Sequence, residues 1–264
     1  MKILHEAPLQ IINEIQTLTD GDYCIPAFMD KYPVYKQFFI DAKSKNRFII
    51  MDNSLFEGYT HTIKDLVEKI NLIKPNIFII PDEWNNKTIT YRNAKYWFNT
   101  IKPILPKETN LMVVLQGEML YEVKELYRLC EDLGCTHFAF NHSSILYQNM
   151  ALGKDKLSNQ SEGRANLIYE MRECGFIKDN HYIHLLGASN LMEFNSYKTD
   201  YYNFINSIDT SSPIINGALG IRYNWETMCK KPINKIEEFM ESDLTDKMDD
   251  IKLNISKFRL MCNN

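Results

Sequence analysis

Carboxylate and amide side chains stand at the ends of several apolar segments of this chain. The run RFIIM leads into Asp52, and FINSI leads into Asp209. NIFII is followed by Pro-Asp-Glu, which contains Asp82 and Glu83, and NLMVVL is followed by Gln116. Two carboxylates that face one glycosidic bond can divide the chemistry, because one attacks the sugar carbon while the other transfers a proton. A carboxylate beside an amide can read the N–H edge of a purine.

Alternating strands and helices would position these side chains. Continuous apolar runs alternate with stretches of helical period, such as TIKDLVEKINLIK. This pattern is typical of a parallel sheet covered on both faces. Seven or eight such units in 264 residues favour a (β/α)8 TIM-like barrel, and IINGALGI is the candidate for its closing strand. A doubly wound open sheet is the alternative, although no G-x-G-x-x-G follows the first strand. In a barrel, the polar strand ends share the C-terminal rim.

Composition limits the class of protein. The formal net charge is −4, so a nucleic-acid partner would need a local basic patch. No apolar run is long enough to cross a membrane, and no signal peptide is recognisable, so we expect a cytoplasmic protein. None of the six cysteines forms a Cys-x-x-Cys pair, so we expect neither a metal nor another cofactor.

Five short motifs, in order along the chain, resemble those of queuine/archaeosine-type tRNA-guanine transglycosylases. They are DNSLFE from Asp52, PDE from Pro81, LQG from Leu115, HLLGAS from His184 and DTSSPIINGALG from Asp209. Each motif alone is weakly specific, but the order and rough spacing of the five hold over residues 48–220. The resemblance implies a barrel enzyme that exchanges guanine for a 7-deazaguanine base through a covalent glycosyl-aspartate.

The resemblance also assigns roles by matched position. Asp209 corresponds to the nucleophile at C1′ and Asp52 to the general acid/base. Phe56 corresponds to the residue that stacks on the base. The remaining base-binding candidates are Asp82, Glu83, Glu57, Gln116, Gly117, Gly187 and Asn141. Glu57 replaces a glutamine of the family, and Asn141-His142 replace a Gly-Gly element.

Two departures concern the polymer that is bound. The cysteines and histidine of the family's C-terminal zinc subdomain are missing, and Ile215 and Ala218 replace arginines that face RNA. The chain is therefore closest in character to compact bacterial and phage enzymes that modify DNA, and a phage protein would act in the host cytoplasm. We expect one domain over residues 1–264, with a helical tail at about 232–264 packed on the barrel.

Several alternatives remain open. Candidate phosphate contacts are Lys87, Arg92, Lys154, Lys156, Arg164 and Arg222. The substrate is DNA in the first interpretation and tRNA, held with a partner subunit, in the second. A hydrolase or transferase acting on free nucleosides or nucleotides would need no basic groove, which agrees with the negative net charge. A non-catalytic base-binding relative is the last alternative, and a homodimer is compatible with all of them.

Overall fold

The chain forms a closed barrel of eight parallel strands, seen in the computed structural model, which describes residues 1–153 and 155–263. The order of the strands in the barrel follows their order in the sequence. The strands are β1 (Lys2–His5), β2 (Gly21–Cys24), β3 (Ile49–Met51), β4 (Ile77–Ile79), β5 (Asn110–Val114), β6 (His137–Phe140), β7 (Tyr182–Leu185) and β8 (Ile205–Asp209). The predicted (β/α)8 fold is confirmed.

Ten α-helices of the described chain alternate with these strands or follow them. They are α1 (Ile12–Gln16), α2 (Pro26–Lys31), α3 (Pro33–Ser44), α4 (Ile63–Ile73), α5 (Lys87–Tyr96), α6 (Leu120–Asp132), α7 (Ile145–Asn149), α8 (Lys156–Glu173), α9 (Ser212–Ala218) and α10 (Met248–Asn263). None of the described helices is long and apolar enough to span a bilayer.

Local sequence explains where the helices after β3 and β4 begin. The side chain of Thr62 accepts a hydrogen bond from the Asp65 N–H at the start of α4. Asn86 caps α5 in the same way through the Ile89 N–H. Such N-caps satisfy amide groups that have no partner within the helix. The caps therefore fix the length of the loops that carry the candidate site residues.

The closing strand differs from the prediction. The apolar segment IINGALG lies in α9 and at its C-terminal end. The strand that closes the barrel beside β8 is instead the short N-terminal segment β1. β1 pairs in parallel with β8, with Leu4 opposite Asp209. Pro213 stands at the first turn of α9, where its fixed φ and missing N–H favour a helix start. Apolar composition alone does not separate these two structures.

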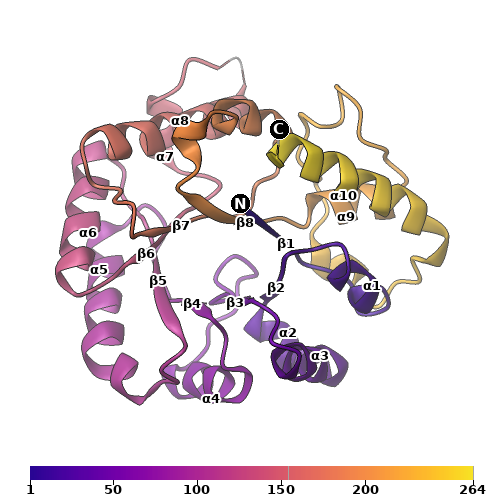
Figure 1. The fold of residues 1–264 in the computed structure, drawn as a ribbon, viewed down its shortest axis with the longest axis horizontal. Coiled ribbons are helices and arrows are strands. Elements are labelled where there is room, and N and C mark those ends of the chain that lie inside the picture. Colours follow the sequence, from indigo (N-terminus) through magenta and orange to yellow (C-terminus); the bar gives the residue numbers. More distant parts are fainter. Residues whose placement is uncertain (154, 264) are drawn as a thin grey trace. The chain divides into compact units, whose positions relative to one another are not determined.

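The described residues cluster into two compact units, each discontinuous in sequence. Unit 1 comprises residues 1–20, 141–170 and 184–264, and unit 2 comprises residues 21–140 and 171–183. Within unit 2, α5 and α6 lie side by side outside β5 and β6 (Figure 1). Within unit 1, α10 packs along α9 (Figure 1).

The described cysteines form no disulfide and differ in exposure. Cys24, Cys130 and Cys135 are buried, and Cys262 is half-buried. Cys174 in unit 2 and Cys229 in unit 1 are exposed.

Candidate active site

The loops after β3, β4 and β5 place a buried polar cluster in unit 2. Asp82 accepts hydrogen bonds on both carboxylate oxygens, from Asn53 Nδ2 at 2.9 Å and from Gln116 Nε2 at 2.6 Å. Asn53 Nδ2 also donates to the Ile80 carbonyl at 3.0 Å. Asp52, Asp82 and Gln116 are all buried. The structure therefore brings together Asp82 and Gln116, which were expected to bind the base, and Asp52, which was expected to transfer a proton to it.

The environment of Asp82 changes its proton affinity. Burial raises the pKa of Asp82 to about 6, although hydrogen bonds from Gln116 and Asn53 act in the opposite direction, and the negative charge of Asp52 adds to the rise. Desolvation penalises the charged form of a carboxyl group. Asp82 is thus a carboxyl group whose charge changes close to neutral pH.

A tight turn holds the residues that follow Asp52. The Asp52 carboxylate accepts from the Ser54 N–H at 3.2 Å, and Ser54 Oγ accepts from the Ala27 N–H at 3.0 Å. Ser54 has φ +62°, a left-handed conformation that usually favours glycine. These bonds compensate for the strain and fix Asp52. Phe56, two residues after Ser54, is exposed, and Glu57 is half-buried.

Gln116 and Gly117 have structural partners in addition to their expected role. Gln116 Oε1 accepts from the Asn85 N–H at 2.9 Å, so this amide joins the β4 loop to the end of β5. A Cβ at Gly117 would lie 3.0 Å from the Glu122 Cβ, so the glycine permits α6 to begin close by. Glu83 and the neighbouring Trp84 are exposed. Trp84 is an aromatic candidate that the sequence interpretation did not single out.

Unit 1 holds the second polar cluster, around Asp209 at the end of β8. Asp209 Oδ1 accepts from the Gly187 N–H at 3.1 Å and lies 3.0 Å from His184 Nε2. His184 Nδ1 lies 2.7 Å from Ser207 Oγ. Within the described residues, Oδ2 of Asp209 accepts no hydrogen bond. One carboxylate oxygen is therefore held and the other is left available.

Backbone conformation and lack of space both favour glycine at position 187. Its φ is +61°, and a Cβ would lie 3.2 Å from the Cβ of His142. A side chain at this position would be strained and would displace the neighbour of Asn141. Asn141, a base-binding candidate, is buried. Burial also lowers the pKa of His142 to about 3, with the positive charges of Lys231 and Arg164 acting in the same direction.

Arg164 does not fit the phosphate-contact role expected of it. Its guanidinium is buried and makes two 2.7 Å hydrogen bonds to the Glu193 carboxylate. It also donates to the Asn141 carbonyl at 3.1 Å and to the Leu186 carbonyl at 2.7 Å. Arg164 therefore ties together the chain after β6 and after β7, and no phosphate can reach it in this conformation.

The other basic candidates divide into two groups. Lys87 pairs with Glu125 at 2.5 Å, and Arg222 pairs with Asp250 at 2.5 Å. Arg92 and Lys156 are exposed. Lys154 lies outside the described residues. Arg92 and Lys156 are the exposed candidates that form no ion pair with the described residues.

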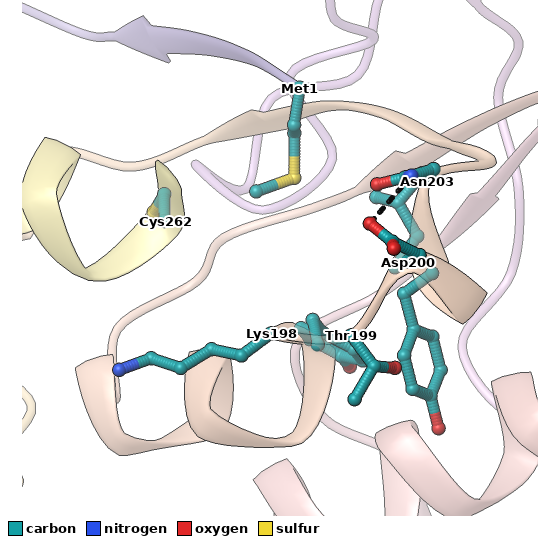
Figure 2. A pocket seen from close by; sticks show the side chains of 9 residues that line it. Met1, Lys198, Thr199, Asp200, Asn203 and Cys262 are labelled. Atoms are coloured by element: carbon teal, nitrogen blue, oxygen red, sulfur yellow. Dashed lines mark hydrogen bonds between the residues drawn. The ribbon is translucent and has the colours of Figure 1, made fainter. Parts of the chain in front are cut away.

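A cavity of about 320 Å³ in unit 1 lies at the other end of β8. It is lined by Met1, Tyr197, Lys198, Thr199, Asp200, Tyr202, Asn203, Ile205 and Cys262. Figure 2 shows Asp200 and Asn203 next to each other on one side of it, joined by a 3.4 Å hydrogen bond. Ile205 begins β8 and Asp209 ends it, a separation of roughly 13 Å at the usual rise of a strand. This cavity is not part of the Asp209 cluster.

One group of potential metal ligands occurs in the described part of the chain. Asp30, His61 and Asp65 present ligand atoms within 4.8 Å of one another. Lys69 Nζ lies 2.9 Å from Asp30 and 2.6 Å from Asp65. Because this ammonium already pairs with both carboxylates, we assign no ion to the group.

Sequence reasoning undervalued His184 and missed Asn53. His184 is a buried histidine with hydrogen bonds at both ring nitrogens, and its contact with Asp209 was not foreseen. Its position two residues into an apolar strand was the signal, because a buried imidazole needs partners. No protein-family model matches the chain, and no curated protein matches it either. Membership of the transglycosylase family therefore stays a prediction from the motifs.

Proposed function

We propose that this protein is a nucleic-acid base-exchange enzyme that replaces guanine with a 7-deazaguanine base, in DNA. The observation that carries the proposal is the state of Asp209. This buried carboxylate ends a barrel strand, one of its oxygens is held by two nitrogen groups, and the other accepts no hydrogen bond from the described residues. Such preorganisation suits an attacking nucleophile.

The proposed reaction needs no cofactor. Asp209 attacks C1′ of the target nucleotide, the C1′–N9 bond breaks, and guanine leaves with the proton of the protonated form of Asp52, which becomes a carboxylate. The incoming base then gives its N9 proton to the Asp52 carboxylate, and N9 attacks C1′ as the bond from C1′ to Asp209 breaks. Each proton and electron pair is returned, so the enzyme ends the cycle unchanged.

The unit 2 cluster supports the choice of a guanine-like base. An ionised Asp82 accepts hydrogen bonds, and guanine presents its N1–H and amino group side by side. Each Asp82 oxygen accepts one hydrogen bond from Asn53 or Gln116, which leaves further lone pairs for a ligand. The exposed ring of Phe56, beside this cluster in sequence, would stack on the base.

Trapping of the covalent intermediate tests the proposal. DNA and tRNA are each incubated with the protein and a labelled 7-deazaguanine, and adducts are separated under denaturing conditions. We expect a protein–DNA adduct and incorporation of label. Asp209→Asn should lower both by a factor on the order of 10⁴ or more. Asp246→Asn, whose side chain is 74% exposed, is the control and should match the wild-type protein.

A second candidate function is exchange or hydrolysis on free nucleosides. The net charge of −4 favours it. So does the burial of Arg164 in its ion pair with Glu193, because phosphate cannot reach this guanidinium. Turnover of free guanosine or deoxyguanosine, without an adduct on either polymer, would establish this function and remove the first.

A further inference from the structure

We infer that His184 is a positioning residue for Asp209. Its imidazole, fixed by the Ser207 hydroxyl, holds Oδ1 so that Oδ2 is the oxygen that attacks. The inference rests on the proposed function, because only that function makes Asp209 a nucleophile. The hydrogen bonds from Ser207 through His184 to Asp209 can be tested independently of the proposed function.

The geometry comes from two neighbouring strands of unit 1. Ser207 and Asp209 are two residues apart on β8, so their side chains lie on the same face. His184 in β7 reaches both, with Nδ1 2.7 Å from Ser207 Oγ and Nε2 3.0 Å from Asp209 Oδ1. Ser207 and His184 are fully buried, and Asp209 is 3% exposed. Water therefore does not compete for these bonds.

Hydrogen-bond chemistry assigns the tautomer. An ionised carboxylate only accepts, so His184 Nε2 carries the hydrogen. In the neutral ring Nδ1 then accepts, and the Ser207 hydroxyl donates to it. If Nδ1 carried the hydrogen, it would donate to Ser207 Oγ, and the Ser207 hydroxyl hydrogen would have to point elsewhere. In the described part of the chain this buried hydroxyl has no other hydrogen-bond partner than His184. The chain of donors therefore runs from Ser207 through His184 to Asp209.

This arrangement differs from a serine hydrolase triad, although it contains the same three residue types. The nucleophile of a triad must be reached by the substrate. Here Ser207 is fully buried inside the strand, whereas Asp209, 3% exposed, ends the strand and has one oxygen that accepts no hydrogen bond from the described residues. The serine is thus the inner anchor, and the aspartate is the reacting end.

Holding Oδ1 has a specific consequence for the attack. His184 and Gly187 both contact Oδ1, so rotation of the carboxylate about χ2 is restricted. A nucleophile held in one orientation reacts faster than one that rotates. Loss of a hydrogen bond to a charged group typically changes a rate about ten- to a hundredfold.

Two polar substitutions separate positioning from packing. His184→Gln places an amide nitrogen where Nε2 was, so it retains the contact with Asp209. His184→Asn places its amide near Nδ1, so it retains the contact with Ser207 and loses the contact with Asp209. We expect single-turnover adduct formation to fall about ten- to a hundredfold in the Asn variant and to stay near wild type in the Gln variant. Affinity for the free base should not change in either, and His137→Gln serves as the histidine control.

Nitrogen NMR of the His184 ring tests the chain without any activity. We expect a hydrogen on Nε2 and an accepting Nδ1, and we expect Ser207→Ala to shift the Nδ1 resonance. A ring with hydrogen on Nδ1 overturns the inference. Equal adduct rates in the Asn and Gln variants also overturn it, while the proposed function stands. If wild-type protein forms no adduct, the proposed function fails, and the NMR result still decides the hydrogen-bond chain.

Discussion

Asp82 carries a carboxyl group whose charge changes near pH 6, because burial raises its pKa to about 6. Above this pH the ionised group accepts the N–H donors of a guanine-like base. Below it the protonated group loses acceptor capacity, so the dissociation constant should rise about tenfold per pH unit. Calorimetric titration of a free 7-deazaguanine from about pH 5 to about pH 8 measures this.

Asp82→Asn provides the comparison for this pH dependence. The variant should bind the base more weakly and without the inflection near pH 6, because an amide does not ionise there. Asp41→Asn, on an exposed part of α3, should keep the wild-type profile. A flat profile in the wild-type protein would contradict the role given to Asp82.

Arg164 and Glu193 form a buried ion pair whose loss should be costly. Arg164→Met leaves a buried carboxylate without its partner, so the free energy of unfolding should fall by about 3–5 kcal/mol. Arg222→Met breaks an exposed pair with Asp250 and should change it by less than about 1 kcal/mol. Urea denaturation compares the two variants, and equal losses would show that the Arg164 pair contributes little.

Helices α9 and α10 depend on a close approach at Gly217. A Cβ there would lie 2.6 Å from the Cα of Ile251 and 2.7 Å from its backbone nitrogen. Gly217→Ala should therefore displace α10 and lower the free energy of unfolding by about 1–3 kcal/mol. Faster proteolysis within α10 and a lower urea midpoint are the readouts. Leu219→Ala, at an exposed side chain after α9, should behave like the wild-type protein.

The elements were predictable where their period was clear. The segments of β3, β4, β5 and β8 read as buried strands from their continuous apolar runs, and α4 as an amphipathic helix from its helical period. The closing strand was predicted at IINGALGI, which lies in and just after α9, whereas β1 was not predicted. IINGALG has the composition of a buried strand, and only the proline before it and the packing of α10 favour a helix.

The site was predictable to the extent that strand ends carry polar residues in a parallel barrel. Asp52, Asp82, Gln116 and Asp209 lie at or just after strand ends, as expected. The burial of Arg164 was not predictable, because its partner Glu193 lies 29 residues away in the sequence. The contact between His184 and Asp209 joins two strands and depends on their register, which periodicity does not give.

The whole chain is acidic, so any polymer must be held against an unfavourable overall charge. Binding through phosphates releases counterions, so DNA affinity should fall steeply as salt rises. Arg92→Gln and Lys156→Gln should each reduce the slope of log affinity against log salt by about 1. Lys36→Gln, at an exposed position on α3, is the control. Affinity independent of salt would favour the free nucleoside as substrate.

The thiols offer a route to labelling the native protein for fluorescence. Burial raises the pKa of Cys24, Cys130, Cys135 and Cys262, so these thiols react slowly. Cys174 and Cys229 are exposed, one in each compact unit. A maleimide dye should therefore modify two thiols of the folded chain and all six after denaturation, as intact mass would show. Donor and acceptor dyes on this natural pair would report by energy transfer whether the two units move when a substrate arrives, with no engineered cysteine.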